Sequence, residues 1–138
     1  MNNKFKGTGV AIITPFHKHG TVDFTSLGKI IEHIINNGVN YIVALGTTGE
    51  TATLTEKEKI AVTDFIIEST DKRVPVVLGI GGNNTQKLIE QIKETNFDGI
   101  DAILSVSPYY TNPHQQGLFY HFNSIDDVSP VPMIISNV

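Results

Sequence analysis

Residues 46–50 of this 138-residue chain read Gly-Thr-Thr-Gly-Glu, which places two hydroxyl side chains between two glycines. The segment follows an apolar run at 41–45 and precedes a helical pattern, so it lies at the carboxyl end of a predicted strand. Threonine hydroxyls and backbone N–H groups donate hydrogen bonds to anionic oxygens. The segment therefore predicts a cradle for a carboxylate or a phosphate. The alternative is an ordinary strand end with local hydrogen bonds.

A second chemically capable segment is the loop 107–113, which carries Tyr109 and Tyr110 between Pro108 and Pro113. A phenol donates or relays a proton when it is held near reacting groups. Two prolines restrict the backbone of the loop and favour a fixed position for the rings. The alternative is an aromatic pair packed at an interface, and we expect this for one of the two tyrosines.

Neither the glycine-rich segment nor the histidines predict a further site. Residues 79–84 lack the third glycine of the dinucleotide fingerprint and follow the third predicted strand rather than the first, so we interpret them as a tight turn with an asparagine N-cap. His17 and His19 fall in a loop, and His114 and His121 are seven residues apart on one predicted helix. No metal site is predicted, and His33 is expected on the solvent side of its helix.

Five apolar, β-rich runs must position the two candidate segments. The runs are nearly continuous rather than alternating, which is typical of parallel strands covered on both faces. Their starts are roughly 25 to 35 residues apart, as expected of βα units. The runs are 9–14, 41–45, 74–79, 102–106 and 132–136.

Four helical patterns lie between these runs. The first, over 24–37, follows Asp23 as a predicted N-cap, and the second opens with Thr55 and Glu58 in the spacing of a capping box. The third covers about 85–95. The fourth is predicted to begin with Asn112 as N-cap and Pro113 as its first residue. Its inward side chains are predicted to be Leu118, Phe119, Phe122 and Ile125.

These elements are compatible with two α/β architectures. Five strands and four helices form either a complete doubly wound domain or the first part of an eight-stranded barrel, which typically needs about 250 residues. The length favours the doubly wound domain, and the loops after the strands favour the barrel. No linker or low-complexity segment divides residues 1–138, so we expect one domain.

The composition excludes several functional classes. The net charge is −4 and Arg73 is the only arginine, so the electrostatic basis for nucleic-acid binding is missing. The chain has no cysteine, which excludes disulfides and thiol nucleophiles. Its apolar runs are too short to span a membrane, and no signal-peptide pattern is recognisable. We expect a cytoplasmic protein without membrane partners.

Taken together, the motifs resemble the dihydrodipicolinate synthase family of the pyruvate-dependent class I aldolases. The matching segments are 46–50, the Pro-Tyr-Tyr of 108–110 with Pro113, the opening stretch 7–16 and the stretch 79–83. The resemblance extends over the whole chain. The Thr-Thr pair and the Tyr-Tyr loop favour the synthase branch over the related N-acetylneuraminate lyases, which usually carry Ser-Thr in the cradle.

The resemblance implies an amino-terminal portion of a (β/α)8 TIM barrel, with about five strands and four helices. It implies condensation of pyruvate with aspartate 4-semialdehyde through a lysine Schiff base, without a metal or another cofactor. Thr48 would bind the pyruvate carboxylate, with Gly46 and Thr47 lining the pocket. Thr47 and Tyr110 would relay protons, Tyr110 reaching into a neighbouring subunit of a homodimer or homotetramer. Ser136 stands where the family has a third relay residue, a tyrosine.

The Schiff-base lysine of the family lies on the sixth strand, beyond residue 138. A Schiff-base lysine must be buried near the substrate carbonyl, and none of the nine lysines present is predicted at the carboxyl end of a strand. We therefore expect the isolated chain to be inactive, or nearly so, and prone to associate through unpaired strand edges. The alternatives are another pyruvate lyase of the superfamily, such as N-acetylneuraminate lyase, and a non-enzymatic five-stranded module that binds anions or other proteins.

Overall fold

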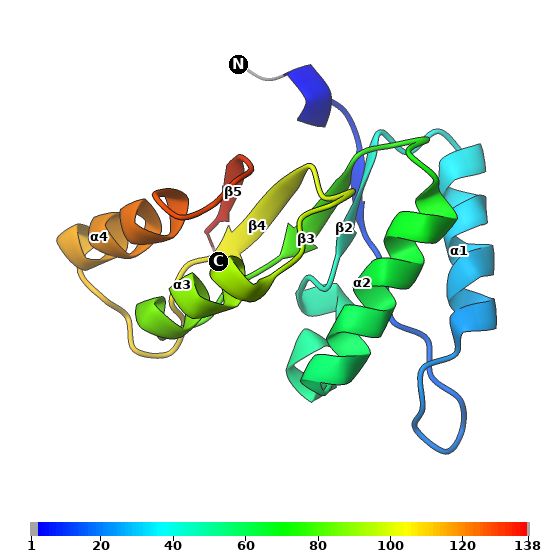
Figure 1. The fold of residues 1–138 in the computed structure, drawn as a ribbon, viewed down its shortest axis with the longest axis horizontal. Helices are drawn as coiled ribbons and strands as arrows, with labels where there is room; N and C mark the ends of the chain where they lie inside the picture. The colour runs from blue at the N-terminus through cyan, green and yellow to red at the C-terminus, as the bar shows by residue number, and fades with distance from the viewer. Residues whose placement is uncertain (1–2, 138) are drawn as a thin grey trace.

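The computed structural model describes residues 3–137 as one parallel sheet with helices packed along it (Figure 1). The strands are β1 (Gly9–Ala11), β2 (Tyr41–Ala44), β3 (Val76–Gly79), β4 (Ala102–Val106) and β5 (Met133–Ser136). The helices are α1 (Phe24–Asn36), α2 (Glu56–Thr70), α3 (Thr85–Glu94) and α4 (Gln115–Asp126). Three short 3-10 turns are η1 (Asn3–Phe5), η2 (Thr47–Gly49) and η3 (Thr51–Thr53).

The strands lie in the sheet in the order in which they occur in the chain, β1-β2-β3-β4-β5, and each adjacent pair is parallel. In a doubly wound sheet the first strand lies inside the sheet, because the order reverses at a switch point. Here β1 is an edge strand, so the doubly wound alternative is excluded. Consecutive parallel order is the arrangement of a (β/α)8 barrel, and the predicted incomplete barrel is confirmed.

The two faces of the sheet carry apolar clusters of unequal size. The larger cluster lies between the sheet and the helices and includes the fully buried Leu27 of α1, Ile42 of β2 and Ile103 of β4. On the opposite face, Val43 and Val77 belong to a small cluster, against which other apolar side chains pack: Phe5, Tyr41, Leu104 and Ile134. Both faces of the strands are thus apolar, which explains their continuous hydrophobic runs.

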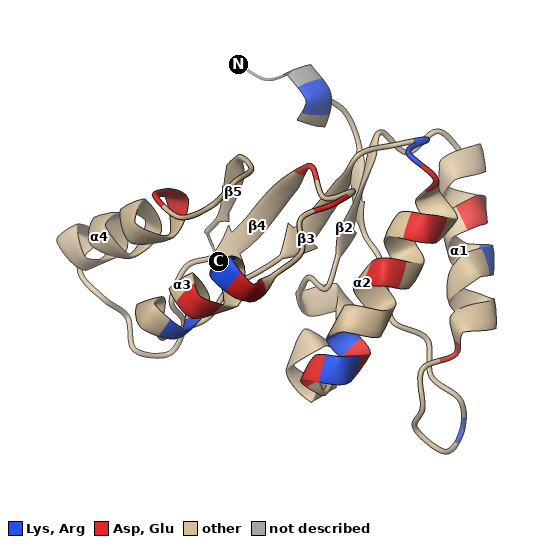
Figure 2. Ribbon diagram, in the orientation of Figure 1, with Lys and Arg blue, Asp and Glu red and all other residues tan. Residues whose placement is uncertain are grey.

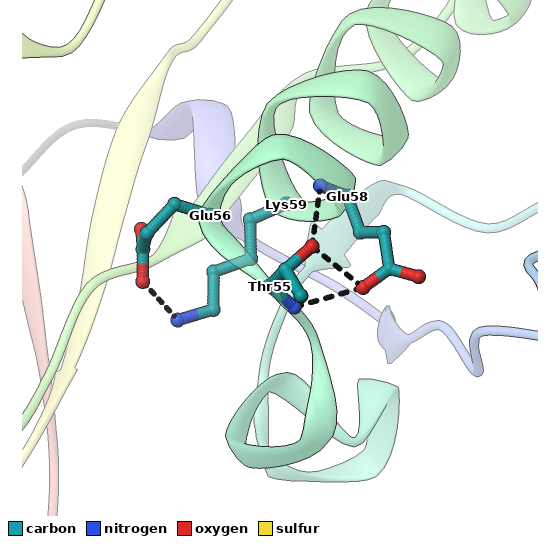
Figure 3. A network of polar contacts seen from close by, with 4 residues as sticks. All are labelled: Thr55, Glu56, Glu58 and Lys59. Carbon is teal, nitrogen blue, oxygen red and sulfur yellow. Dashed lines mark hydrogen bonds and ion pairs between the residues drawn. The ribbon is translucent and has the colours of Figure 1, made fainter.

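The first two long helices begin where their capping residues predict. The Asp23 carboxylate accepts hydrogen bonds from Ser26 N at 2.9 Å and Ser26 Oγ at 2.6 Å at the start of α1. At the start of α2, Thr55 Oγ1 accepts from Glu58 N at 3.3 Å while the Glu58 carboxylate accepts from Thr55 N at 2.8 Å (Figure 3). This reciprocal pair is the predicted capping box. Beside it, Lys59 and Glu56 form an ion pair at 2.9 Å.

The predicted start of α4 is wrong. Asn112 has a φ of 46° and continues the loop in the left-handed conformation, which asparagine tolerates better than most residues. The helix begins at Gln115 with His114 as its N-cap, whose Nδ1 accepts a hydrogen bond from Gly117 N at 3.0 Å. Phe119, predicted to face inward, is 61% exposed, whereas His121 is buried.

Charged side chains are distributed unevenly over the helices. Figure 2 shows acidic and basic residues along α1, α2 and α3, whereas α4 carries a single charged residue, Asp126, at its carboxyl end. Phe119 and Tyr120 of α4 are both exposed to solvent. The solvent-exposed face of α4 is therefore more apolar than the exposed face of a helix that contacts only water. No helix in the described part of the chain is long and apolar enough to cross a membrane.

Candidate functional site

The Gly-Thr-Thr-Gly-Glu segment forms a tight turn at the carboxyl end of β2. Its internal hydrogen bonds run from Gly49 N to Gly46 O and from Glu50 N to Thr47 O, both at 3.0 Å. These bonds leave the N–H groups of Thr47 and Thr48 unused. Both threonines are exposed, whereas Gly49 is buried. Hydroxyl and amide donors are therefore presented to solvent on one turn, as an anion cradle requires.

Residues of both neighbouring strands support this turn. The buried Thr14, which follows β1, donates a hydrogen bond through Oγ1 to Gly49 O at 2.7 Å. On the other side, a Cβ added to Gly79 at the end of β3 would lie 2.3 Å from Leu45 O and 3.0 Å from Gly46 N. Only glycine allows this approach. Leu45 itself has a φ of 53°, an uncommon conformation for leucine, so the entry to the cradle is strained.

The Tyr109-Tyr110 loop follows β4 and is held by its backbone. Tyr109 N donates to Asn83 Oδ1, from the loop after β3, at 2.7 Å. Thr111 N donates to Tyr109 O at 2.8 Å, and Tyr110 between them has a φ of 69°. These are features of a γ-turn in its rare, strained form. The Tyr110 side chain is 100% exposed.

Ser136 ends β5 and pairs in register with Val106 of β4. Its carbonyl oxygen accepts a hydrogen bond from Ser107 N at 3.0 Å. The residue is half-buried. Ser136 therefore lies on the strand next to the one from which the tyrosine loop emerges.

The carboxyl edge of the sheet thus carries all the predicted site residues. The cradle follows β2, the glycine-rich loop follows β3, the tyrosine loop follows β4, and Ser136 ends β5. Within residues 3–137 no side-chain hydrogen bond joins Thr47, Tyr110 and Ser136, so this chain by itself does not connect the three relay positions. The predicted roles of these residues remain predictions. Three supporting residues, Thr14, Gly79 and Asn83, act through contacts that their local sequence does not indicate.

The glycine-rich segment after β3 is a short loop that leads into α3, and its predicted asparagine N-cap is confirmed. Asn84 is the N-cap of α3, and its Oδ1 accepts a hydrogen bond from Lys87 N at 3.1 Å. A Cβ on Gly81 would lie 3.0 Å from Val106 N and 2.8 Å from Val106 Cγ1. The glycines therefore let the ends of β2, β3 and β4 approach one another closely.

None of the lysine and arginine side chains in residues 3–137 is buried. Eight of the nine lysines are exposed, and the half-buried Lys59 is paired with Glu56 at 2.9 Å. The exposed Lys4 pairs with Asp101. Residues 3–137 therefore contain no buried lysine amine. In the same residues no group of three or more His, Asp or Glu side chains is placed to hold a metal ion.

A parallel sheet in consecutive order, with helices between its strands and polar loops at their carboxyl ends, defines part of a (β/α)-barrel protein. The sequence profile of the Dihydrodipicolinate synthetase family matches residues 4–138. The chain belongs to this family.

Curated relatives with the name 4-hydroxy-tetrahydrodipicolinate synthase are similar throughout the chain. The protein of Flavobacterium psychrophilum is 48% identical over 134 residues, which are 97% of this chain and 46% of the relative. The protein of Bacillus subtilis is 40% identical over 134 residues, again 97% of this chain and 46% of the relative. The chain thus spans about half the length of the curated relatives it matches.

Solved structures agree with this relationship. The 4-hydroxy-tetrahydrodipicolinate synthase of Methylacidiphilum fumariolicum has a TM-score of 0.91 at 41% identity, covering 98% of this chain and 45% of that one. The chloride-inhibited dihydrodipicolinate synthase of Acinetobacter baumannii, solved with pyruvate, has a TM-score of 0.90 at 45% identity, covering 96% of this chain and 45% of that one. The five-stranded fold is therefore that of part of the synthase barrel.

Proposed function

We propose that this chain forms the carboxylate-binding and proton-relay part of a 4-hydroxy-tetrahydrodipicolinate synthase, which condenses pyruvate with aspartate 4-semialdehyde. The observation that carries the proposal is the turn after β2, whose Thr47 and Thr48 present free donors beside the glycine-bounded end of β3. A cradle of this kind suits the carboxylate of a small keto acid. The names of the relatives support the same reaction.

In this proposal the Thr48 hydroxyl and N–H orient pyruvate by its carboxylate, and the Thr47 hydroxyl passes protons to and from the reacting carbon. The pyruvate carbonyl must condense with a lysine amine before its methyl carbon can attack the aldehyde as an enamine. Residues 3–137 contain no buried lysine for this step. The amine is therefore expected from a part of the barrel outside these residues, and the 138-residue chain alone is expected to bind without catalysing.

The exposed γ-turn at Tyr110 supports an oligomeric enzyme. The Tyr110 phenol is fully exposed on a strained, hydrogen-bonded turn, so packing against its own chain does not stabilise it. Such a turn is suited to deliver its ring into a second subunit, so we propose that Tyr110 completes the relay of a neighbouring chain in a homodimer or homotetramer. We further propose a cytoplasmic location for the enzyme.

A second candidate function is a binding module without catalysis, since the described residues provide a cradle but no buried lysine. Both candidate functions predict that the chain binds pyruvate. They differ in one outcome: only the synthase function predicts that adding the rest of a synthase barrel restores turnover. No observation on this chain favours N-acetylneuraminate lyase activity.

Pyruvate binding to the full chain, measured by ligand-observed NMR, tests the proposal. Thr48→Val removes one hydroxyl at constant volume and is expected to weaken binding about tenfold, the effect of losing a hydrogen bond to a charged group. Thr25→Val, an exposed threonine of α1, is the matched control and is expected to bind as the parent chain does. Equal pyruvate affinity in the Thr48→Val variant would contradict the cradle assignment.

Borohydride reduction in the presence of pyruvate separates binding from covalent chemistry. The mass of the 138-residue chain is expected to remain unchanged, because a Schiff base needs a buried amine. A pyruvyl adduct on this chain would show that one of its own lysines supplies the amine. It would also contradict the division of the site between this chain and the rest of the barrel.

A further inference from the structure

One buried polar contact outside the candidate site links the two helices nearest to the tyrosine loop. His121, in the second turn of α4, is only 5% exposed. Its Nδ1 lies 2.8 Å from Thr85 Oγ1, at the first residue of α3. Its Nε2 is buried without a hydrogen-bond partner in the described part of the chain. A buried polar group with an unsatisfied atom is costly and calls for an explanation.

The contact is close to the residue that holds the tyrosine loop. Asn83, which accepts the hydrogen bond of Tyr109 N, stands two residues before Thr85. The loop itself connects β4 to α4, so its far end moves with α4. The hydrogen bonds of Tyr109 and of His121 therefore converge on the three-residue stretch that starts α3. One bond fixes the loop, and the other fixes the helix into which the loop runs.

The other buried side chains of α3 and α4 are apolar and their packing is less specific. Leu88 and Ile92 of α3 and Ile125 of α4 are buried in the large cluster. Apolar side chains tolerate small shifts of one helix along another, whereas a hydrogen bond is directional and sets one arrangement. The Thr85–His121 pair is thus the directional contact between α3 and α4 in the described residues.

The ring of His121 is suited to this role in its neutral form. Burial lowers the pKa of His121. The charged residues of the two helices, which are Lys87, Glu90, Lys93, Glu94 and Asp126, are all exposed. A neutral imidazole makes one hydrogen bond through Nδ1 with the threonine hydroxyl, whichever tautomer is present, because a hydroxyl both donates and accepts.

We propose that His121 is a positioning residue: through Thr85 it fixes α4 against the start of α3, and together with the Asn83–Tyr109 hydrogen bond it sets the place of the Tyr110 turn. The use of Tyr110 as a proton relay rests on the function proposed above. The positioning of the turn is a property of this fold and is measurable without catalysis.

Amide hydrogen exchange of the full chain, read by mass spectrometry over residues 107–114, tests this role. Thr85→Val removes the hydroxyl at constant volume and is expected to speed exchange of the Tyr109 amide about five- to tenfold, the effect of losing one hydrogen bond. Thr85→Ser keeps the hydroxyl and is expected to restore the slow exchange. Asn83→Ala removes the acceptor directly and gives the reference value for a released loop.

Ile92→Val is the matched control, because it trims a buried apolar side chain of α3 without removing a hydrogen-bonding group. It is expected to leave exchange in residues 107–114 at the parent rate even where it lowers overall stability. The proposal is overturned if Thr85→Val leaves this exchange unchanged, or if Ile92→Val speeds it as much as Thr85→Val does. Pyruvate affinity, measured on the same samples, reports separately on the proposed function.

Discussion

At the scale of single residues, the cradle depends on the absence of a side chain at Gly79. Gly79 has no Cβ, so Leu45 O comes within a distance that any other residue would block. The strained Leu45 then directs the chain into the exposed donors of Thr47 and Thr48. Close packing of this kind transmits small steric changes directly to a neighbouring turn.

Gly79→Ala is therefore expected to destabilise the protein by about 2 kcal/mol, the cost of an overpacked contact, and to weaken pyruvate binding by displacing the cradle. Urea unfolding measures the first effect and NMR titration the second. Gly82→Ala is the control, since its Cβ would meet nothing closer than Leu88 Cδ2 at 3.7 Å. Equal stability of the two variants would show that the β2 turn moves freely.

The sequence predicted the location of Thr47, Thr48 and Tyr110, because the pattern of a strand followed by polar residues is local. It did not predict the roles of Thr14 and Asn83. Thr14 lies 35 residues from its partner Gly49, and Asn83 lies 26 residues from Tyr109. Such contacts depend on which strands become neighbours, and this is known only once the sheet order is known.

At the scale of elements, the helix starts show where local signals are sufficient. The N-caps of α1, α2 and α3 and the capping box of α2 are formed by residues three apart, and the structure confirms them. At α4 two local signals compete. Asn112-Pro113 resembles a helix start, but Asn112 takes a positive φ in the tyrosine loop, and a ring nitrogen of His114 replaces it as the cap. The requirements of the loop thus override the local preference of the helix.

The capping box of α2 predicts a measurable dependence on pH. Hydrogen bonds from the N–H and hydroxyl of Thr55 hold the pKa of the Glu58 carboxyl below its usual 4.5. As the pH falls below about 4.5, the unfolded chain takes up this proton before the folded one. Stability from the box is therefore complete above that pH and is lost as the pH falls through the lowered pKa of the folded state.

Urea unfolding of Glu58→Gln and of the parent chain, compared between pH 7 and 3, checks this expectation. The parent is expected to be more stable at pH 7, and the difference should shrink toward pH 3. Thr55→Ala is expected to cost about 1 kcal/mol at neutral pH, as loss of an N-cap does, while Thr55→Ser keeps the hydroxyl and serves as control. A constant difference between Glu58→Gln and the parent at all pH values would rule out the contribution of the Glu58 carboxylate.

At the scale of the whole molecule, the sheet described for residues 3–137 ends in two edge strands, β1 and β5, each of which pairs with a neighbour on one side only. Apolar side chains are exposed at or near these edges: Ile13 after β1, Ile135 on β5, and Phe119 on α4. The hollow lined by Leu118, Phe122 and Ile135 lies beside the β5 edge. Exposed edges and apolar patches of this kind favour association with other chains.

We expect the 138-residue chain to self-associate at micromolar concentration, and sedimentation velocity over a range of concentrations measures this. The double variant Phe119→Lys with Ile135→Lys is expected to shift the chain toward monomer, because it introduces charge beside the β5 edge. Ile60→Lys changes an equally exposed residue of α2 and should have little effect. A parent chain that is monomeric at every concentration would show that these edges are already protected.

The consecutive strand order also determines how the polypeptide acquires its structure. Each of the strands β2 to β5 pairs with the strand that precedes it in the chain, and the partners lie about 25 to 34 residues apart, as for Val77 with Ala102 and Ile42 with Val76. Within residues 3–137 no strand pairs with a segment farther along the chain than the next strand, so the loop-closure entropy of each of these pairings stays small. The supports of the cradle after β2, Thr14 and Gly79, come from the ends of the neighbouring strands β1 and β3, so every residue that shapes the cradle lies within the first 79 residues of the chain.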